Sequence, residues 1–209
     1  MELPNPFQYP KSPHIRRHGP VGYPDYGRYK PFLRDEFEFR CVYCLERERW
    51  YPNRGDSFSA DHFTPKSIQA GRETDYENLV YSCLRCNSFK ATKVLLLDPT
   101  RTALADHVQV DEDGHIVGIT SEGQDLIDLL DLDHDRAVEV RQEIVKLLRV
   151  KAEYPSDSNV HALYLSRFGY PNDLPDLKAL RPPGGNLKPE GLERCHFERG
   201  KAGLLPDVY

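Results

Sequence analysis

The spacing of apolar and polar residues predicts two pairs of β-strands. The stretches 57–66 and 77–83 are rich in residues that favour the extended conformation, and they are separated by a polar connection. Between 107 and 120, alternating residues flank Asp111-Glu-Asp-Gly114, a sequence typical of a tight turn. We therefore expect a strand pair in the first region and a β-hairpin in the second.

Helical spacing predicts four helices around these strands. The first is short and covers 32–39, and the last covers 159–170. Ser121-Glu-Gly-Gln124 matches a capping box and predicts the start of the second helix at Ser121. A third helix is expected from about Asp133, because five apolar residues fall on one stripe: Ala137, Val140, Ile144, Leu147 and Leu148.

The two ends of the chain have a different composition. Residues 1–31 are rich in Pro, Gly and Tyr, so regular structure is not expected there. Basic residues alternate with tyrosines in this segment, which suits either an arm that touches nucleic acid or a strap packed over the core. We favour the strap. The Pro-rich stretch 171–209 predicts a wrap or a loose tail.

Composition limits the class of protein. The chain has 209 residues with a net charge of −5, which is unusual for a protein that binds a polyanion, so any affinity for nucleic acid must be local. No apolar run is long enough for a membrane span, and residues 1–6 lack the features of a secretory signal. We expect a cytoplasmic protein without a membrane partner, where paired cysteines favour metal over disulfide.

Two C-x2-C pairs carry the strongest chemical signal. Cys41, Cys44, Cys83 and Cys86 supply four thiolates on two tight turns, which predicts a tetrahedral zinc site that closes the chain between them. The zinc has a structural role in this interpretation. An open alternative is that no chemistry takes place near it.

The segment between the cysteine pairs contains candidate catalytic residues. A hydrolytic cation needs hard oxygen ligands, and the carboxylate of Asp61 together with the amide oxygen of Asn87 would supply two of them to Mg²⁺ or Mn²⁺. His62 is then available as a general base. Asn87 has an alternative interpretation as the cap of the helix that begins near it.

The order of these residues resembles the HNH, or ββα-metal, endonuclease superfamily. The resemblance covers 39–93 and rests on C-x2-C, Asp61-His62-Phe-Thr-Pro, Asn78-Leu, and Cys83-Leu-Arg-Cys86-Asn87-Ser-Phe-Lys90. It implies that His62 is the general base, that Asn78 pins the hairpin loop and helps to orient His62, and that Asp61 and Asn87 hold one divalent cation. Asn87 stands where many members of the family have His. Lys90 and Lys93 are candidates for phosphate contact, with solvated surface lysines as the alternative.

The resemblance also completes the predicted architecture. We expect an α+β fold with a ββα-metal nuclease core over 32–100, held by the four-Cys zinc site, and a mixed hairpin and helical accessory layer over 101–170. An irregular arm, 1–31, and a Pro-rich tail, 171–209, flank these parts. The core alone is too small to bury enough apolar surface, which is why an accessory layer is expected.

The predicted function is hydrolysis of phosphodiester bonds in DNA, most simply double-stranded. A fainter resemblance to small bacterial HNH proteins of phage-defence systems implies a regulatory partner such as an ATPase. The alternative is a non-catalytic zinc module, derived from a nuclease, that binds nucleic acid or protein. Cys195-His196 lacks partners at ligand spacing and is interpreted as an ordinary thiol beside a surface imidazole.

Overall fold

The computed structural model describes residues 5–209, and these form two compact units. One unit joins residues 15–95 to 170–208, and the other contains residues 5–14 together with 96–169 and residue 209. Each unit is therefore discontinuous in sequence. The four-part division 1–31, 32–100, 101–170 and 171–209 stays a prediction of functional boundaries.

An antiparallel hairpin forms the centre of the unit that contains the cysteines. Strand β1, Phe58–His62, pairs with β2, Leu79–Cys83, in a register that sets Phe58 opposite Cys83 and His62 opposite Leu79. The strand pair expected here is confirmed. Its two strands are almost wholly buried, so they are covered by other elements on both faces.

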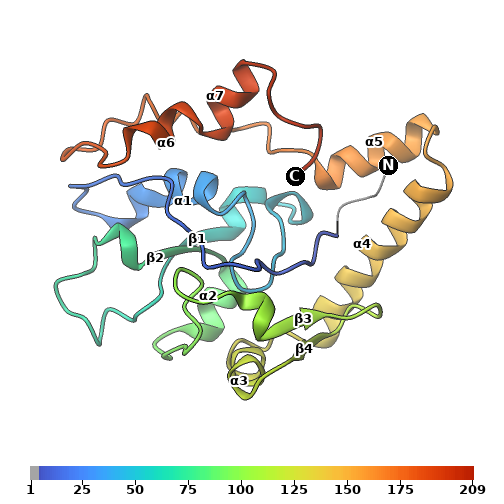
Figure 1. Ribbon diagram of the computed structural model, residues 1–209, viewed down its shortest axis with the longest axis horizontal. Helices are drawn as coiled ribbons and strands as arrows, with labels where there is room; N and C mark the ends of the chain where they lie inside the picture. The colour runs from blue at the N-terminus through green and yellow to red at the C-terminus, as the bar shows by residue number, and fades with distance from the viewer. Residues whose placement is uncertain (1–4) are drawn as a thin grey trace. The chain divides into compact units, whose positions relative to one another are not determined.

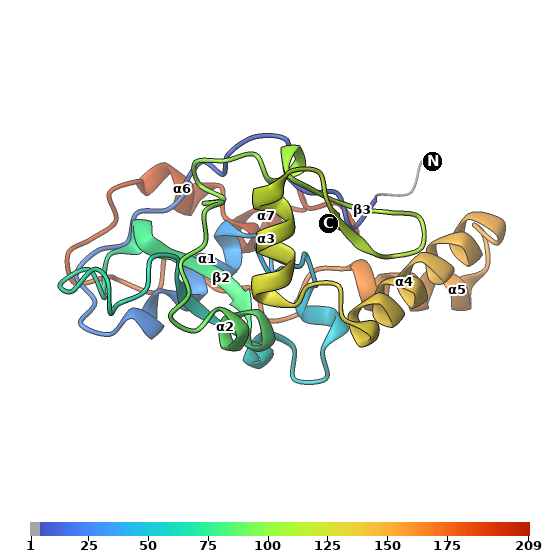
Figure 2. The ribbon, with the colours of Figure 1, turned by 90° about the horizontal axis from the view of Figure 1, so that it is seen from below.

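Two short helices cover this hairpin. Helix α2, Leu84–Lys90, follows β2 directly, and α1, Lys30–Glu36, precedes the first cysteine pair. In Figure 1 α1 lies above the hairpin and α2 below it, and in Figure 2, seen from below, both helices again lie next to β2. The ββα core with an added helix is therefore confirmed. Short 3₁₀ turns complete the unit: η1, Tyr26–Tyr29; η2, Glu48–Trp50; η3, Arg54–Ser57; and η4, Tyr76–Asn78.

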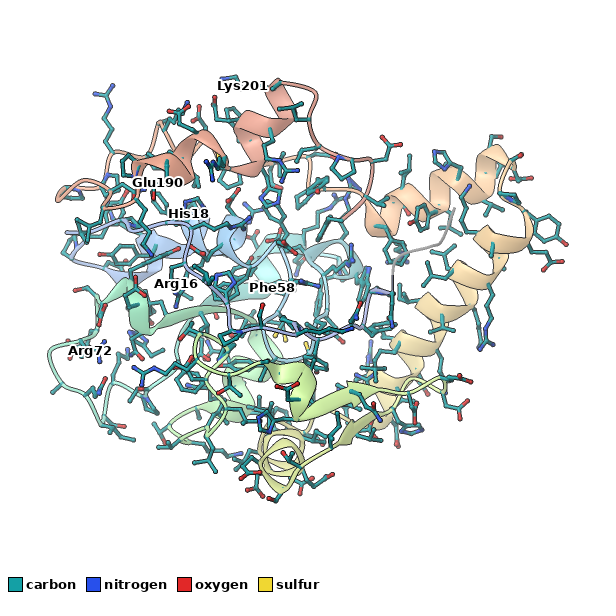
Figure 3. The ribbon with its side chains drawn as sticks, in the orientation of Figure 1. Arg16, His18, Phe58, Arg72, Glu190 and Lys201 are labelled. Atoms are coloured by element: carbon teal, nitrogen blue, oxygen red, sulfur yellow. The ribbon has the colours of Figure 1, made fainter. Side chains whose placement is uncertain are left out.

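Several residues of 15–31 are buried, as the strap interpretation predicts: Arg16, His18, Tyr23 and Tyr29. Arg16 is buried and its Nη2 donates to the carbonyls of Leu79 at 2.6 Å and Glu77 at 3.1 Å. Its guanidinium also lies over the Phe37 and Tyr76 rings, at 5.3 and 5.2 Å from their centroids. A basic residue of this segment thus anchors the strap through its charge and does not face solvent. Figure 3 shows Arg16 close to His18 on the same strap.

The C-terminal segment contains two helices that its composition did not predict. Helix α6, Pro189–Glu193, and α7, His196–Lys201, follow a long irregular stretch. Gly191 of α6 meets the strap so closely that a Cβ there would lie 1.9 Å from the carbonyl oxygen of Arg17. Only glycine permits this contact, and it fixes α6 over His18 (Figure 3).

A buried carboxylate joins these segments. Oδ2 of Asp35, in α1, lies 2.7 Å from Nε2 of His18, and Oδ1 accepts from His196 at 2.7 Å (backbone N) and 2.8 Å (Nδ1). The expectation of a surface imidazole at His196 is wrong, because its side chain is buried against Phe39 and Tyr170. The burial of His196 depends on its contact with Asp35, which is 161 residues away in sequence.

The second unit contains the expected hairpin and helices. Strands β3, Val108–Val110, and β4, Ile116–Gly118, pair antiparallel after the turn η5, Leu104–Asp106. The helices are α3, Ser121–Leu130; α4, Asp135–Glu153; and α5, Ser158–Phe168. Helix α3 begins at Ser121 as expected, and its cap is Thr120, whose hydroxyl accepts from the Gly123 backbone. The caps of α4 and α5 are His134 and Asp157.

A buried arginine organises this second unit. Arg141 of α4 donates to the carbonyl oxygens of Gly114, in the β3–β4 turn, and Leu132, and it pairs with Asp133 at 3.1 Å. This guanidinium fixes α4 against the hairpin turn.

Among residues 5–209, no helix combines the length and the apolar character that crossing a bilayer requires.

We expect Asp35→Asn to destabilise the protein by about 3 kcal/mol at pH 7, because two buried imidazoles lose an ionised partner. Burial alone would raise the pKa of Asp35, but hydrogen bonds from His18 and His196 outweigh it and hold that pKa below its usual value. The stabilisation is therefore complete above the unfolded-state pKa of about 4 and is lost as the pH falls below it. The measurement is the free energy of unfolding of wild type and variant between pH 3 and 7.

The difference between the two proteins should be largest near neutral pH and should shrink in acid. Asp207→Asn, which alters an exposed carboxylate, is the matched control and should leave stability unchanged within about 0.5 kcal/mol. A wild-type and Asp35→Asn difference that is the same at every pH would contradict an ionised Asp35 at this junction.

Candidate active site and zinc site

The first cysteine pair lies on a tight turn. Arg40 and Arg47 form an isolated β-bridge around it, the amide of Cys41 donates to the Glu46 carbonyl at 2.8 Å, and the amide of Leu45 donates back to Cys41 at 3.0 Å. Leu45 takes a left-handed conformation, φ 63°, to close the turn. This geometry directs Cys41 and Cys44 to the same side.

The second pair lies at the junction of β2 and α2. Cys83 is the N-cap of α2, and its sulfur accepts from the amide of Cys86 at 3.4 Å. The first turn is attached to the same strand because the amide of Val42 donates to the Tyr81 carbonyl at 3.0 Å. Backbone hydrogen bonds therefore help to place the two pairs next to each other.

The four sulfurs form one buried cluster. All lie within 4.8 Å of one another, and the Cys44 and Cys83 sulfurs are 3.8 Å apart. A tetrahedral zinc ion with Zn–S bonds of about 2.3 Å would separate its ligands by about 3.8 Å. The expected grouping of Cys41, Cys44, Cys83 and Cys86 is confirmed, and the cluster fits zinc in donor type, number and spacing.

His62, the candidate base, ends β1 with its imidazole held at one nitrogen. Nε2 lies 2.7 Å from the carbonyl oxygen of Glu73, which only accepts hydrogen bonds. Nε2 must therefore carry the proton, and the neutral ring presents Nδ1 as its acceptor. Burial lowers the pKa of His62 below its ordinary value, which favours this neutral form at pH 7.

Asn78 joins the two sides of the loop that follows His62. Its side-chain Oδ1 accepts from the amide of Thr64 at 2.9 Å, and Nδ2 donates to the Thr64 carbonyl at 2.9 Å. The amide of Phe63 also donates to the Asn78 carbonyl at 2.8 Å. These bonds extend the β1–β2 ladder past its last residue pair, which restricts the backbone next to His62.

Asp61 is buried and accepts hydrogen bonds at both carboxylate oxygens. The Tyr43 hydroxyl donates to Oδ2 at 2.9 Å, and the Lys90 ammonium lies 3.2 Å from Oδ1. Burial raises the pKa of Asp61 above its ordinary value, while Lys90 and Tyr43 act in the opposite direction. Each oxygen of a carboxylate can accept about two hydrogen bonds, so one further interaction at each oxygen remains open.

The structure corrects the expectation for Lys90. Its side chain is fully buried, and its ammonium also donates to the carbonyl of His62, so it neither faces solvent nor offers itself to a phosphate. The helical position alone suggested a surface residue, but a buried carboxylate next to it requires a counter-charge. Lys93, three residues further on, is exposed.

Asn87 lies inside α2, about one turn after its cap. Because Cys83 is the N-cap, the alternative that Asn87 caps this helix is wrong. Its Nδ2 donates to the Ser59 hydroxyl on β1 at 2.8 Å, which leaves Oδ1 as the amide atom available to a cation. Asn87 and Lys90 thus contact Ser59 and Asp61 on the same face of β1.

A hollow of about 380 Å³ brings the candidate residues together. Asp61, His62 and Asn87 all line it, so the two candidate ligand residues and the candidate base border one space. Hard oxygen donors of this kind suit a divalent cation. The rest of the lining is Tyr26, Ala60, Pro65, Lys66, Ser67, Ala91 and Thr92.

Some of the residues around the hollow were missed in the sequence. Tyr43 lies within the first cysteine pair, so the sequence places it close to the motif, although not its contact with Asp61. Tyr26 gave no such signal, because it lies far from the motif in a segment expected to be irregular. The contact between His62 and the Glu73 carbonyl has no sequence signature, since every residue has a backbone carbonyl.

A comparison with protein families identifies the same segment. Residues 41–93 match the family model of the HNH endonuclease. The match extends over both cysteine pairs, the β1–β2 hairpin and α2, so this segment is similar to an HNH endonuclease domain. The similarity supports a nuclease-type function. No curated protein matches the chain.

We expect Lys90→Met to destabilise the zinc-loaded protein by about 3 kcal/mol, because it leaves the Asp61 carboxylate buried without its cation. Lys93→Met is the matched control, since it removes an exposed ammonium three residues further along the chain, and it should change stability by less than about 0.5 kcal/mol. Denaturant unfolding at constant zinc measures both. Equal stabilities for the two variants would show that Lys90 is not buried against Asp61.

Proposed function

We propose that this protein is a metal-dependent HNH endonuclease that hydrolyses phosphodiester bonds in DNA. His62 is its general base, Asp61 and Asn87 hold one divalent cation, and Asn78 keeps the loop after His62 in place. Zinc on the four cysteines holds the fold together and takes no part in the reaction.

One observation carries this proposal. His62, Asp61 and Asn87 line the same hollow, and the hydrogen bond from Nε2 to the Glu73 carbonyl makes Nδ1 the acceptor nitrogen of His62. A base with a fixed tautomer, next to two hard oxygen donors, is the arrangement that hydrolysis of a phosphodiester requires.

The protein residues act at defined atoms in this reaction. Nδ1 of His62 accepts a proton from a water molecule while that water forms a bond to phosphorus. The bond from phosphorus to the 3′ oxygen breaks, and the 3′ oxygen takes a proton from solvent, which leaves a 5′-phosphate and a 3′-hydroxyl. A divalent cation bound here would supply charge stabilisation to the phosphate and the leaving oxygen.

The ligand set predicts weak binding of this cation. Asp61 and Asn87 contribute a single negative charge between them. The Lys90 ammonium, 3.2 Å from Oδ1 of Asp61, is positively charged and therefore repels the divalent cation. Mg²⁺ or Mn²⁺ should therefore exchange freely, whereas zinc held by four thiolates should not.

The substrate of this proposal is double-stranded DNA. A protein with a net charge of −5 gains little from long-range attraction to DNA, so binding depends on local contacts or on a partner. A regulatory partner such as an ATPase, a role in phage defence and a cytoplasmic location belong to the proposal through the fainter family resemblance.

A second candidate function rests on Lys90. Because its ammonium already neutralises Asp61, the hollow resembles a carboxylate site satisfied without metal. This favours a zinc-stabilised module that binds nucleic acid or protein without cleaving it. The two candidates differ in a simple way, since only the enzyme requires a divalent cation in addition to zinc.

We expect wild type to nick or linearise supercoiled plasmid with Mg²⁺ or Mn²⁺, and His62→Ala to lose at least about 100-fold in rate, the usual contribution of a general base. His161→Ala, an exposed histidine on α5, is the matched control and should cleave at the wild-type rate. Brief EDTA treatment should stop cleavage without loss of zinc or fold, and added Mn²⁺ should restore it.

Each outcome bears on a different part of the proposal. Cleavage by His62→Ala at the wild-type rate would exclude His62 as the base. Cleavage that persists in EDTA would exclude a weakly held cation on Asp61 and Asn87. DNA binding without cleavage under any divalent cation would favour the second candidate function.

A further inference from the structure

One wall of the hollow comes from outside the segment that matches the family. Tyr26, in the 3₁₀ turn η1, lines the hollow together with His62, although the family match begins only at Cys41. The Tyr26 and His62 ring centroids are 4.5 Å apart and their planes meet at 65°. The strap therefore contributes a side chain to the site itself.

The fold fixes where Tyr26 points. In a 3₁₀ turn, side chains three residues apart lie on the same side, which aligns Tyr26 with Tyr29. Tyr29 is fully buried and its ring packs 5.6 Å from that of Tyr76. The turn is capped by Asp25, whose carboxylate accepts from the amide of Gly27 at 2.8 Å. Tyr26 is thus held by a core residue one turn away.

This contact supplies something that the hydrogen bond of His62 does not. A ring tied through one nitrogen can still tilt about that bond, and the tilt changes where the opposite nitrogen points. An edge-to-face contact at 4.5 Å is a favoured aromatic geometry and restricts the plane of the imidazole. Tyr26 therefore limits the direction in which Nδ1 can accept a proton.

Tyr26 has a second partner in the hollow. The Lys66 ammonium lies 4.8 Å from the centroid of the Tyr26 ring, within the range of a cation–π interaction. Lys66 is exposed, and in the part of the chain that the structure describes it makes no ion pair with a carboxylate. Lys90, the other nearby lysine, is already paired with Asp61. Lys66 is thus the lysine of this hollow with charge to offer to an anion.

We propose that Tyr26 is a positioning residue for His62, and that it holds Lys66 at the wall of the hollow as the cation that binds a backbone phosphate beside the scissile one. This inference rests on the proposed nuclease function and deepens it. The chemistry recognised is a phosphodiester of the nucleic-acid backbone, which carries one negative charge and no base identity.

Kinetics of Tyr26 variants test the positioning role. Tyr26→Leu should lower kcat for plasmid cleavage about tenfold at saturating Mn²⁺, because a misaligned base slows the chemical step. Tyr26→Phe retains the ring and should restore kcat to within about twofold of wild type. Tyr154→Leu, an exposed tyrosine at the end of α4, is the control and should have no effect. Zinc content should be equal in all four proteins.

Salt dependence of DNA binding tests Lys66 without any need for cleavage. In a His62→Ala background, Lys66→Met should reduce the slope of log K against log salt for a short DNA duplex by about one unit, the loss of one phosphate contact. Lys66→Arg should keep the slope. Lys201→Met is the matched control, because Lys201 also lies over an aromatic ring, 5.2 Å from the Phe197 centroid, but on α7.

The outcomes separate this inference from the proposed function. Wild-type protein that does not cleave would end the proposed function, while the salt slopes would still decide whether Lys66 contacts phosphate. Active wild type with an unchanged kcat for Tyr26→Leu, or with Tyr26→Phe as slow as Tyr26→Leu, would overturn the positioning role. An unchanged slope for Lys66→Met would overturn the phosphate contact.

Discussion

The four cysteine sulfurs are the constraint on which the candidate site depends. They connect the turn at Cys41 and Cys44 to the junction of β2 and α2, and the sulfurs lie within 4.8 Å of one another. That junction sets where α2 begins, and α2 carries Asn87 and Lys90 to the face of β1 that holds Asp61. Zinc bound by these thiolates would contribute folding free energy directly to the hairpin that carries His62.

Buried polar groups hold together the other segments of the unit that contains the cysteines. Its hairpin and short helices supply a small apolar core, so the strap, α1 and the C-terminal helices are joined through ionised groups at Asp35 and Arg16. The same principle operates in the site, where Lys90 compensates Asp61. Such pairs specify one arrangement, because removing either member leaves a buried charge.

The sequence predicted the elements whose signals are local. The strand pair, the hairpin around Asp111, the helices of 121–170 and the grouping of the four cysteines all follow from periodicity or spacing within short segments. Three features could not be predicted in this way. His196 is buried by Asp35, Lys90 by Asp61, and Tyr26 reaches His62, and each contact joins residues at least 29 positions apart. Partners that are distant in sequence determine whether such a side chain is buried or exposed, and local patterns do not reveal these partners.

The central proposal is that the ββα core binds two metals with different roles. Anomalous diffraction from crystals grown with Mn²⁺, recorded at the zinc and manganese edges, tests it most directly. We expect a zinc peak among the sulfurs of Cys41, Cys44, Cys83 and Cys86, and a manganese peak between the oxygens of Asp61 and Asn87. Manganese absent from that position, or zinc bound there and missing from the cysteines, would contradict it.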